Sequence, residues 1–229
     1  LLYQSLASTR QQLEDSVQRA ARGLADDIDR DIQNRILLLR TLATSRNLQS
    51  GALSEFHRQA NDALTDQLSR VVLFTADLKP VLNSAVEFGR PLPPSENAVA
   101  AEVVRTRTPQ VSDLFTDPVQ GTQSLSVAVP IIRDGTVRYV LMLVFDASRL
   151  VLFLEAQHPP KGWVTGISDR GGKVISRLYG QDDYVGKSLS PEILERSRRE
   201  TGVFRTRNLA GQEVLRAVAF VPSSGWMVA

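Results

Sequence analysis

Polar side chains suited to ligand recognition lie in the middle of the chain, inside or beside segments that otherwise read as apolar strands. Arginine can hold a carboxylate through two parallel hydrogen bonds, and hydroxyl groups can satisfy its remaining acceptor sites. Ser124 and Ser126 should share one face of a strand, because side chains alternate between the two faces of a sheet. The predicted partner is a small polar molecule such as a carboxylate; the alternative is that this face is simply solvated. The candidate ligand-binding residues are Arg70, Phe74, Ser112, Asp113, Thr122, Ser124, Ser126, Arg138 and Tyr139.

The sequence carries no complete catalytic or metal-binding motif. Its two histidines, His57 and His158, stand apart from any metal-ligand or nucleophile pattern. The segment 166–170 resembles a nucleophile elbow, but its last residue is Arg where a Gly must allow the sharp turn. The segment 186–188 resembles the end of a phosphate-binding loop, but Gln replaces the Gly that this loop requires five residues earlier. We therefore predict no catalytic activity, no metal and no cofactor, and these departures disfavour the rival reading of a hydrolytic enzyme.

Composition places the chain among ordinary globular proteins. Of its 229 residues 42% are hydrophobic and 23% are charged, which allows one large domain or two small ones. The 27 Lys and Arg residues nearly balance the 25 Asp and Glu residues, so the chain does not have the basic surface that nucleic-acid binding needs. The absence of Cys excludes disulfides and thiolate chemistry and is compatible with an exported bacterial domain.

Apolar residues recur at helical spacing over the first forty residues, with Arg, Asp and Gln between them. Such a helix would span roughly 60 Å, more than one compact domain of this size requires. Part of the stripe can pack on the domains that follow, and part can support weak pairing with a second copy, although a steady heptad is missing. The stripe consists of Leu2, Leu6, Leu13, Val17, Ala20, Leu24, Ile28, Ile32, Ile36, Leu39 and Leu42. A second helix is predicted after Gly51, from Ser54 to about Ser69.

Strand patterns begin at Arg70 and are interrupted by short helices. Strands are predicted over 71–76, 81–88, 110–115, 122–132 and 136–145, and Asp134-Gly135 between the last two is a strong hairpin signal. Short helices are predicted over 96–107 and 148–157. From Lys161 a smaller unit repeats this order with strands at 162–168, 173–178, 202–207, 213–220 and 226–229 and a helix at 191–200. Antiparallel hairpins flanked by short helices indicate an α+β fold.

Several of these segments, in this order and spacing, resemble the double Cache sensor domains of bacterial histidine kinases, chemoreceptors and diguanylate cyclases, which are tandem PAS-like domains of the PDC fold. The resemblance implies a long N-terminal stalk helix at 1–50, a membrane-distal PAS-like domain at 51–158 that binds the ligand, and a membrane-proximal one at 159–229. The segments that carry it are the long N-terminal helix, VVLFTADLKPVLNS at 71–84 with Gly89-Arg90-Pro91, VSDLF at 111–115, VAVPIIRDGTVRYVL at 127–141, GWVTGISDRGGKVISR at 162–177, YVGKSL at 184–189 and SGWMVA at 224–229.

The resemblance also implies a function: an extracytoplasmic sensor domain, on the periplasmic side of an inner-membrane receptor, most like those of histidine kinases. Alternatives are a chemoreceptor or diguanylate cyclase ectodomain, or a dimerisation module that binds no ligand. Members of the family that bind amino acids carry an aromatic and Arg-rich pattern near the second helix and first strands, and that pattern is missing here. The chain opens as a helix and stops as a strand, so we expect transmembrane segments of about 20 residues on both sides of it.

Overall fold

The structure is a computed structural model and describes residues 2–65, 68–94, 97–200, 202–208 and 210–229, with side chains from residue 8 onward. It contains two compact units: unit 1 comprises residues 1–30 and 148–229, and unit 2 comprises residues 31–147. The first helix, α1 (Leu2–Ala43), contributes residues to both units. This division differs from the predicted one, in which residues 1–50 form a stalk separate from both domains.

The apolar stripe of α1 becomes buried from residue 21 onward. Leu24 and Ile28 are buried in unit 1, and Ile32, Ile36 and Leu39 are buried in unit 2. Toward the start of the helix the stripe is less covered, since Leu13 is 46% exposed and Val17 is only partly buried. The side chains of Leu2 and Leu6 lie outside the described residues. The predicted period is therefore confirmed for the part of the stripe that packs on each unit.

Unit 2 is built around one antiparallel sheet of order β2-β1-β6-β5-β3, with β4 paired to β5. Its two long strands, β5 and β6, form a hairpin in the middle of the sheet, and β1 lies beside β6 in an unbroken register from Ser69–Phe145 to Thr75–Tyr139. The elements of this unit after α1 are α2 (Arg46–Ser50), α3 (Leu53–Ala63), β1 (Ser69–Thr75), β2 (Pro80–Asn83), α4 (Ala98–Thr106), β3 (Gln110–Val111), β4 (Phe115–Thr116), β5 (Gln123–Arg133) and β6 (Thr136–Asp146).

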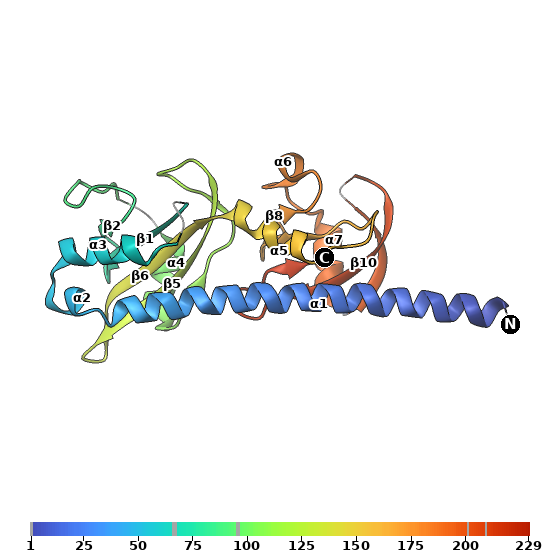
Figure 1. Cartoon of the computed structure of the whole chain (residues 1–229), viewed down its shortest axis with the longest axis horizontal. Coiled ribbons are helices and arrows are strands. Elements are labelled where there is room, and N and C mark those ends of the chain that lie inside the picture. Colours follow the sequence, from blue (N-terminus) through green and yellow to red (C-terminus); the bar gives the residue numbers. More distant parts are fainter. Residues whose placement is uncertain (1, 66–67, 95–96, 201, 209) are drawn as a thin grey trace. The chain divides into compact units, whose positions relative to one another are not determined.

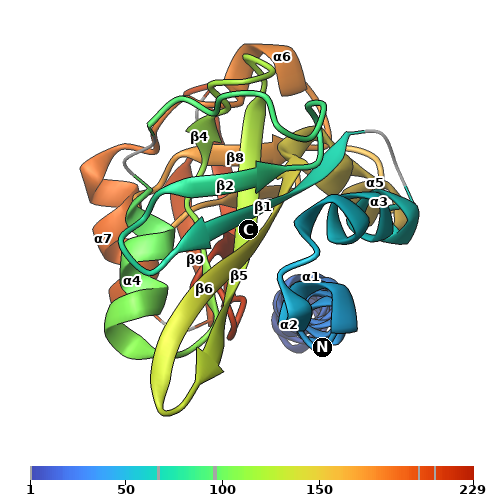
Figure 2. The ribbon, with the colours of Figure 1, turned by 90° about the vertical axis from the view of Figure 1, so that its left-hand side faces the viewer.

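The two faces of this sheet have different coverings. One face packs on the end of α1 and on α3, and the guanidinium of Arg35 lies 3.9 Å from the ring centroid of Phe145. The opposite face packs on α4, whose Ala100 and Val103 join Val72, Met142 and other strand residues in one buried cluster. Figure 2 shows α4 on one side of β1, β5 and β6, and α1 with α3 on the other. We call the face that packs on α4 the α4 face of unit 2.

The hairpin turn between β5 and β6 supplies a test of local structure. Asp134 and Gly135 have φ angles of 49° and 73°, the left-handed conformation that a two-residue turn with matching twist requires. We expect Gly135→Ala to lower the free energy of unfolding by about 1 kcal/mol, because a Cβ disfavours this conformation. Asp134→Asn is the control and should be nearly neutral, since Asn tolerates the same region. Equal effects of the two substitutions in urea denaturation would contradict this turn geometry.

Unit 1 contains a second antiparallel sheet, of order β8-β7-β11-β10-β9. One face of it packs on α7 through a buried cluster. The cluster includes Val174, Ile193, Phe204, Val218 and Met227. Figure 1 labels α7, β8 and β10 of this unit. We call this the α7 face of unit 1. The elements of this unit after α1 are the 3₁₀ helix η1 (Ala147–Leu150), which begins at the end of unit 2, α5 (Val151–Ala156), β7 (Gly166–Ser168), β8 (Val174–Arg177), α6 (Gln181–Tyr184), α7 (Pro191–Arg199), β9 (Gly202–Arg207), β10 (Glu213–Phe220) and β11 (Met227–Val228).

The predicted α+β class, with a long first helix and two antiparallel sheets flanked by short helices, is confirmed. The predicted second helix was too long, because α3 ends at Ala63 and Ser69 already pairs with Phe145 in the sheet. The two short helices α2 and α6 were not predicted. Among the described residues, no helix combines the length and apolar character that crossing a bilayer requires.

Candidate ligand-binding site

A buried ion pair lies at the centre of the polar residues on the α4 face of unit 2. Arg70 in β1 is 4% exposed and Asp117, in the loop after β4, is fully buried. The guanidinium donates to both carboxylate oxygens, with a distance of 2.7 Å from Nη2 to Oδ1 and a second contact from Nη1 to Oδ2. Paired arginine and carboxylate groups of this kind are strongly oriented, because two parallel hydrogen bonds fix both planes.

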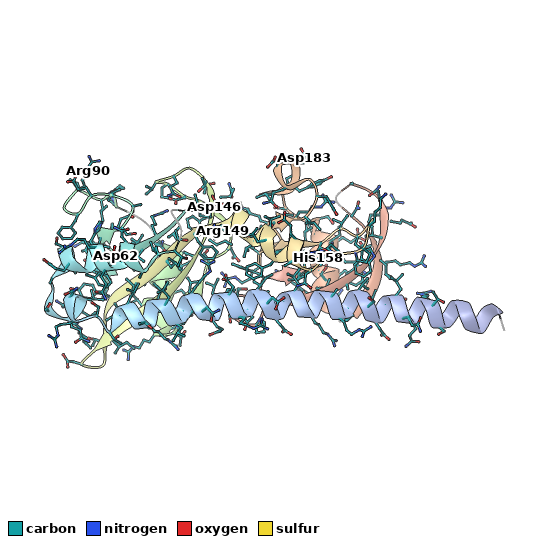
Figure 3. The ribbon with its side chains drawn as sticks, in the orientation of Figure 1. Asp62, Arg90, Asp146, Arg149, His158 and Asp183 are labelled. Carbon is teal, nitrogen blue, oxygen red and sulfur yellow. The ribbon has the colours of Figure 1, made fainter. Side chains whose placement is uncertain are left out.

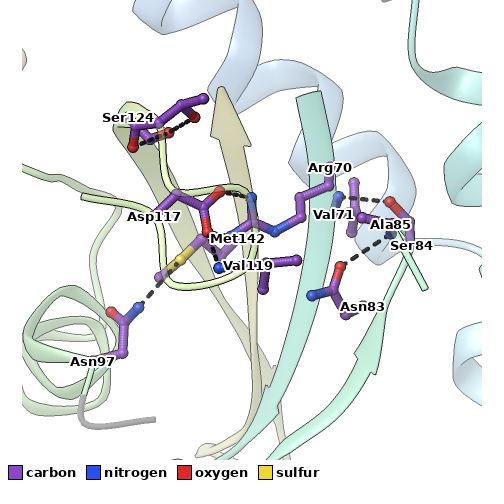
Figure 4. Close-up of polar contacts among 11 residues, drawn as sticks. Arg70, Val71, Asn83, Ser84, Ala85, Asn97, Asp117, Val119, Ser124 and Met142 are labelled. Atoms are coloured by element: carbon purple, nitrogen blue, oxygen red, sulfur yellow. Dashed lines mark hydrogen bonds and ion pairs between the residues drawn. The ribbon is translucent and has the colours of Figure 1, made fainter. Parts of the chain in front are cut away.

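The carboxylate is held in place by its own turn. The backbone N–H of Asp117 donates to the carbonyl of Thr122 at 2.8 Å, and the N–H of Gly121 donates to the carbonyl of Asp117 at 2.8 Å. Oδ1 of Asp117 also accepts from the backbone N–H of Val119 at 2.8 Å. Asp117 is therefore fixed before any ligand arrives, and it in turn fixes one edge of the Arg70 guanidinium (Figure 4).

Next to this pair, the α4 face carries small side chains and unused polar atoms. Ser124, Ser126 and Ala128 follow one another on this face of β5. Val144 of β6 pairs with Ser126 of β5 on one side and with Arg70 of β1 on the other, so all three residues lie in one row across the sheet. At two strand spacings their backbones are about 10 Å apart. In the described part of the chain, Nε of Arg70 and Oγ of Ser126 have no hydrogen-bond partner, although both atoms are buried. Leaving such groups unsatisfied costs about 1 to 3 kcal/mol each, which a suitable ligand could recover.

Further polar groups line the same side of the sheet and are engaged within the protein. Asn97 caps α4 by accepting from the N–H of Ala100 at 2.9 Å, and its Nδ2 lies 3.6 Å from Sδ of Met142. The hydroxyl groups of Thr122 and Ser124 lie 3.3 Å apart. Figure 4 shows Asn97, Met142 and Ser124 around the Arg70–Asp117 pair. These contacts add side-chain amide and hydroxyl groups at the border of the candidate site.

The structure brings some of the predicted residues together and separates others. Arg70, Ser124 and Ser126 share the α4 face, with Thr122 beside Ser124, and Phe74 lies farther along β1 in the apolar cluster with α4. Ser112 uses its hydroxyl to accept from the N–H of Ser126 at 2.7 Å, so its role is to hold β5.

The remaining predicted residues lie elsewhere. Asp113 follows Ser112 and is partly buried. Arg138 is exposed and lies six residues along β6 from Val144, about 20 Å from the row of Arg70 and Ser126. Tyr139 points to the opposite face, because it alternates with Arg138 along β6. The predicted clamp of Arg138 with the serine hydroxyls is thus not assembled, and Arg70 takes the central place.

Sequence reasoning missed Asp117, although one signal pointed to it. An arginine that precedes the apolar run VVLF and is buried in the sheet needs an acidic partner, because an unpaired buried charge is costly. The sequence offers both Asp113 and Asp117 as acidic partners for Arg70. The choice between them depends on the turn from Asp117 to Thr122, which holds the Asp117 carboxylate in place. Asn97 was missed because its role depends on the start of α4, which was placed slightly too early.

The histidines take part in packing and surface contacts. The ring of His57 lies edge-on to Phe88 with centroids 5.9 Å apart, and its Nε2 is 2.8 Å from the carbonyl of Val86. His158 is exposed on unit 1, as is Asp183, and both are labelled in Figure 3. Across the described residues, no group of three or more His, Asp or Glu side chains could hold a metal ion.

Solved structures with the same fold include ligand-binding domains of Pseudomonas chemoreceptors. The domain of Pseudomonas fluorescens CtaA, in complex with L-serine, has a TM-score of 0.71 at 16% identity over 96% of each chain. The domain of Pseudomonas aeruginosa PctB, in complex with L-Gln, has a TM-score of 0.68 at 16% identity and covers 93% of this chain and 88% of its own. The domain of P. aeruginosa PctC, in complex with GABA, has a TM-score of 0.68 at 17% identity over 94% and 98%.

No protein-family model and no curated protein matches the sequence. The likeness to solved structures therefore rests on shape, and it extends over nearly the whole chain. The chain has the Cache-type α+β fold of receptor ligand-binding domains, as the resemblance of its sequence implied.

Proposed function

We propose that this chain is the extracytoplasmic, periplasmic sensor domain of a transmembrane signalling receptor of the inner membrane. It binds a small polar molecule, preferably one with a carboxylate, at Arg70, Ser124 and Ser126 in unit 2. The observation that supports this most is the pair of buried, unpartnered polar atoms, Nε of Arg70 and Oγ of Ser126, beside an ion pair in the described part of the chain. No catalytic step is part of the proposal.

The chemistry of the site favours a ligand with both negative and neutral or positive groups. Arg70 offers Nε to a carboxylate, and Ser126 offers a hydroxyl that can donate or accept. Asp117 already neutralises the charge of Arg70. A ligand with two negative charges would therefore bind more weakly here than one whose own positive and negative charges cancel. The three chemoreceptor domains bind L-serine, L-Gln and GABA, which are molecules of this type, and this supports an amino acid as one candidate ligand.

Ligand binding is proposed to act on an equilibrium between two arrangements of the receptor. A ligand shifts such an equilibrium only by its difference in affinity for the two states, about 1 to 3 kcal/mol in typical cases. The long helix α1 gives residues to both units and is the element through which we propose that the signal leaves the ligand-binding unit. Weak homodimerisation along α1 remains a prediction, and the exposed Leu13 is a residue on which to test it.

We propose that the full-length receptor is a histidine kinase, because the sequence most resembles the ectodomains of that class. A chemoreceptor is the second candidate, because the three solved structures named above are chemoreceptor domains. The sequence of the complete gene product distinguishes the two. An ATP-binding kinase domain would support the first, and a long methyl-accepting helical hairpin would support the second and overturn the first.

The binding site is tested by thermal denaturation with a panel of acetate, succinate, L-serine, L-Gln, GABA, an amine and a sugar. A ligand present at 100 times its Kd should stabilise the fold by about 2.7 kcal/mol, which is visible as a rise in Tm. Ser126→Ala should reduce this rise while leaving the Tm without ligand unchanged or slightly higher, since its hydroxyl has no partner among the described residues. Ser54→Ala, at an exposed position of α3, is the control. If no carboxylate-bearing compound raises the Tm, or if Ser126→Ala responds as the control does, the proposed site is wrong.

A further inference from the structure

A second row of side chains crosses the α4 face of unit 2 beside the row that holds Arg70. Its members lie opposite one another on the four neighbouring strands β2, β1, β6 and β5: Asn83, Val72, Met142 and Ala128. The last three belong to the buried cluster beneath α4, so the side chain of Asn83 lies on this face too. Asn83 and Arg70 are diagonal neighbours on adjacent strands, with Cα atoms about 7 to 8 Å apart.

The protein uses the amide of Asn83 only on its oxygen side. Oδ1 accepts from the backbone N–H of Ala85 at 3.0 Å, and this bond fixes which way the amide group points. Nδ2 has no hydrogen-bond partner among the described residues, although Asn83 is only 8% exposed. Two N–H donors of a buried side chain are therefore left over next to Arg70.

The amide of Asn97 is used in the same way. Its Oδ1 accepts from the N–H of Ala100 at the start of α4, at 2.9 Å. Its Nδ2 lies 3.6 Å from Sδ of Met142, and a thioether is a weak acceptor. Figure 4 shows Asn83 and Asn97 on the two sides of the Arg70–Asp117 pair. Each amide thus gives its oxygen to the backbone and keeps its NH₂ group for another partner.

The carboxylates near the site, in contrast, are already engaged. Oδ1 of Asp117 accepts from Nη2 of Arg70 and from the N–H of Val119, and Oδ2 accepts from Nη1. Asp146, at the end of β6 on the same face, also has an interaction within the chain. The unused side-chain groups named so far are one guanidinium N–H, two amide NH₂ groups and the hydroxyl of Ser126. Of these, only the hydroxyl can accept a hydrogen bond.

We propose, on the basis of the function proposed above, that the ligand is a monocarboxylate with a neutral hydrogen-bond acceptor beside its carboxylate, such as a 2-oxo acid. Its carboxylate accepts from Nε of Arg70 and from the hydroxyl of Ser126. Its oxo oxygen accepts from Nδ2 of Asn83, with Nδ2 of Asn97 as a second donor. An ammonium group in the place of this oxygen would bring three further donors to amide N–H groups that cannot accept. The site therefore favours the 2-oxo acid over the amino acid of the same skeleton.

The test compares ligands that differ only at the carbon next to the carboxylate, by isothermal titration of this chain. Pyruvate, propionate and L-alanine form one set, and 2-oxoisovalerate, isovalerate and L-valine form a larger one. In the set that binds more tightly, the 2-oxo acid should bind at least tenfold more tightly than both other members. It alone satisfies the amide N–H groups, and a buried donor without a partner is costly.

Asn83→Asp turns the unused donor into an acceptor and keeps the oxygen that receives the N–H of Ala85. The preference for the 2-oxo acid over the plain carboxylate should fall from at least tenfold to about one, and the amino acid should now bind more tightly than the plain carboxylate. Asn97→Asp keeps the cap of α4 and should reduce the preference as well. Asn34→Asp is the matched control, because it adds the same charge at an exposed position of α1 and should keep the preference. A preference measured within one variant does not depend on how stable that variant is.

Three results would overturn the proposal: the amino acid binds as tightly as the 2-oxo acid, the plain carboxylate does so, or Asn83→Asp keeps the preference as Asn34→Asp does. In the first two cases the proposed function stands as long as Ser126→Ala still weakens the binding. Absence of binding by both sets also overturns the proposal. The thermal panel then decides on the proposed function separately: a rise in Tm with another carboxylate upholds it, and no rise rejects both.

Discussion

Asp117→Ala is expected to lower the free energy of unfolding of unit 2 by about 3 to 5 kcal/mol, because it leaves the charge of Arg70 buried and unpaired. Arg70 is 4% exposed, and both of its Nη atoms donate to the carboxylate of Asp117. The loss should be read from urea denaturation followed by circular dichroism, with an unchanged dependence on urea concentration if the native state stays compact.

Two further variants separate the ion pair from general disturbance of the loop. Arg70→Met combined with Asp117→Leu removes both charges and should recover most of the loss, since an apolar pair of similar volume avoids the desolvation cost. Asp77→Ala removes an exposed partner of Lys79 and should have only a small effect, because solvent screens that pair. If Asp117→Ala is as mild as Asp77→Ala, the carboxylate does not have the buried role described above.

Trp226→Ala is expected to lower the free energy of unfolding of unit 1 by about 3 to 5 kcal/mol, since it removes the largest fully buried side chain of the chain's described part. Phe220→Ala is the comparison, because Phe220 is 45% exposed on the same sheet and should cost much less. Equal losses for the two in chemical denaturation would contradict the burial of Trp226.

The elements of the fold could be predicted where local signals and tertiary contacts agree. The apolar stripe from Leu24 to Leu42 predicts a helix by its period. The Asp134-Gly135 pair predicts a hairpin turn by its residue types. The end of the second helix could not be predicted in this way, because Ser69 belongs to β1 through its pairing with Phe145, a residue far along the chain. Local helix propensity has no access to such a contact.

The sites were harder to predict than the fold, for a physical reason. A strand shows which residues share a face, but not which face is covered by a helix. The prediction therefore included both Arg138 and Tyr139, which the structure places on opposite faces of β6.

The division of unit 1 along the sequence has a consequence for biosynthesis. Its first thirty residues are made before residues 31–147, while their partners are made after them: Gln18 donates to the carbonyl of Val218, and Asp29 accepts from the N–H of Ser223. Residues 31–147 are complete much earlier and can fold as a unit during synthesis. Until the strands of unit 1 emerge, Leu24 and Ile28 have no sheet to cover them. While residues 31–147 and the first strands of unit 1 are being made, the nascent chain therefore carries an uncovered amphipathic segment at residues 1–30, and that segment is where a chaperone would be needed.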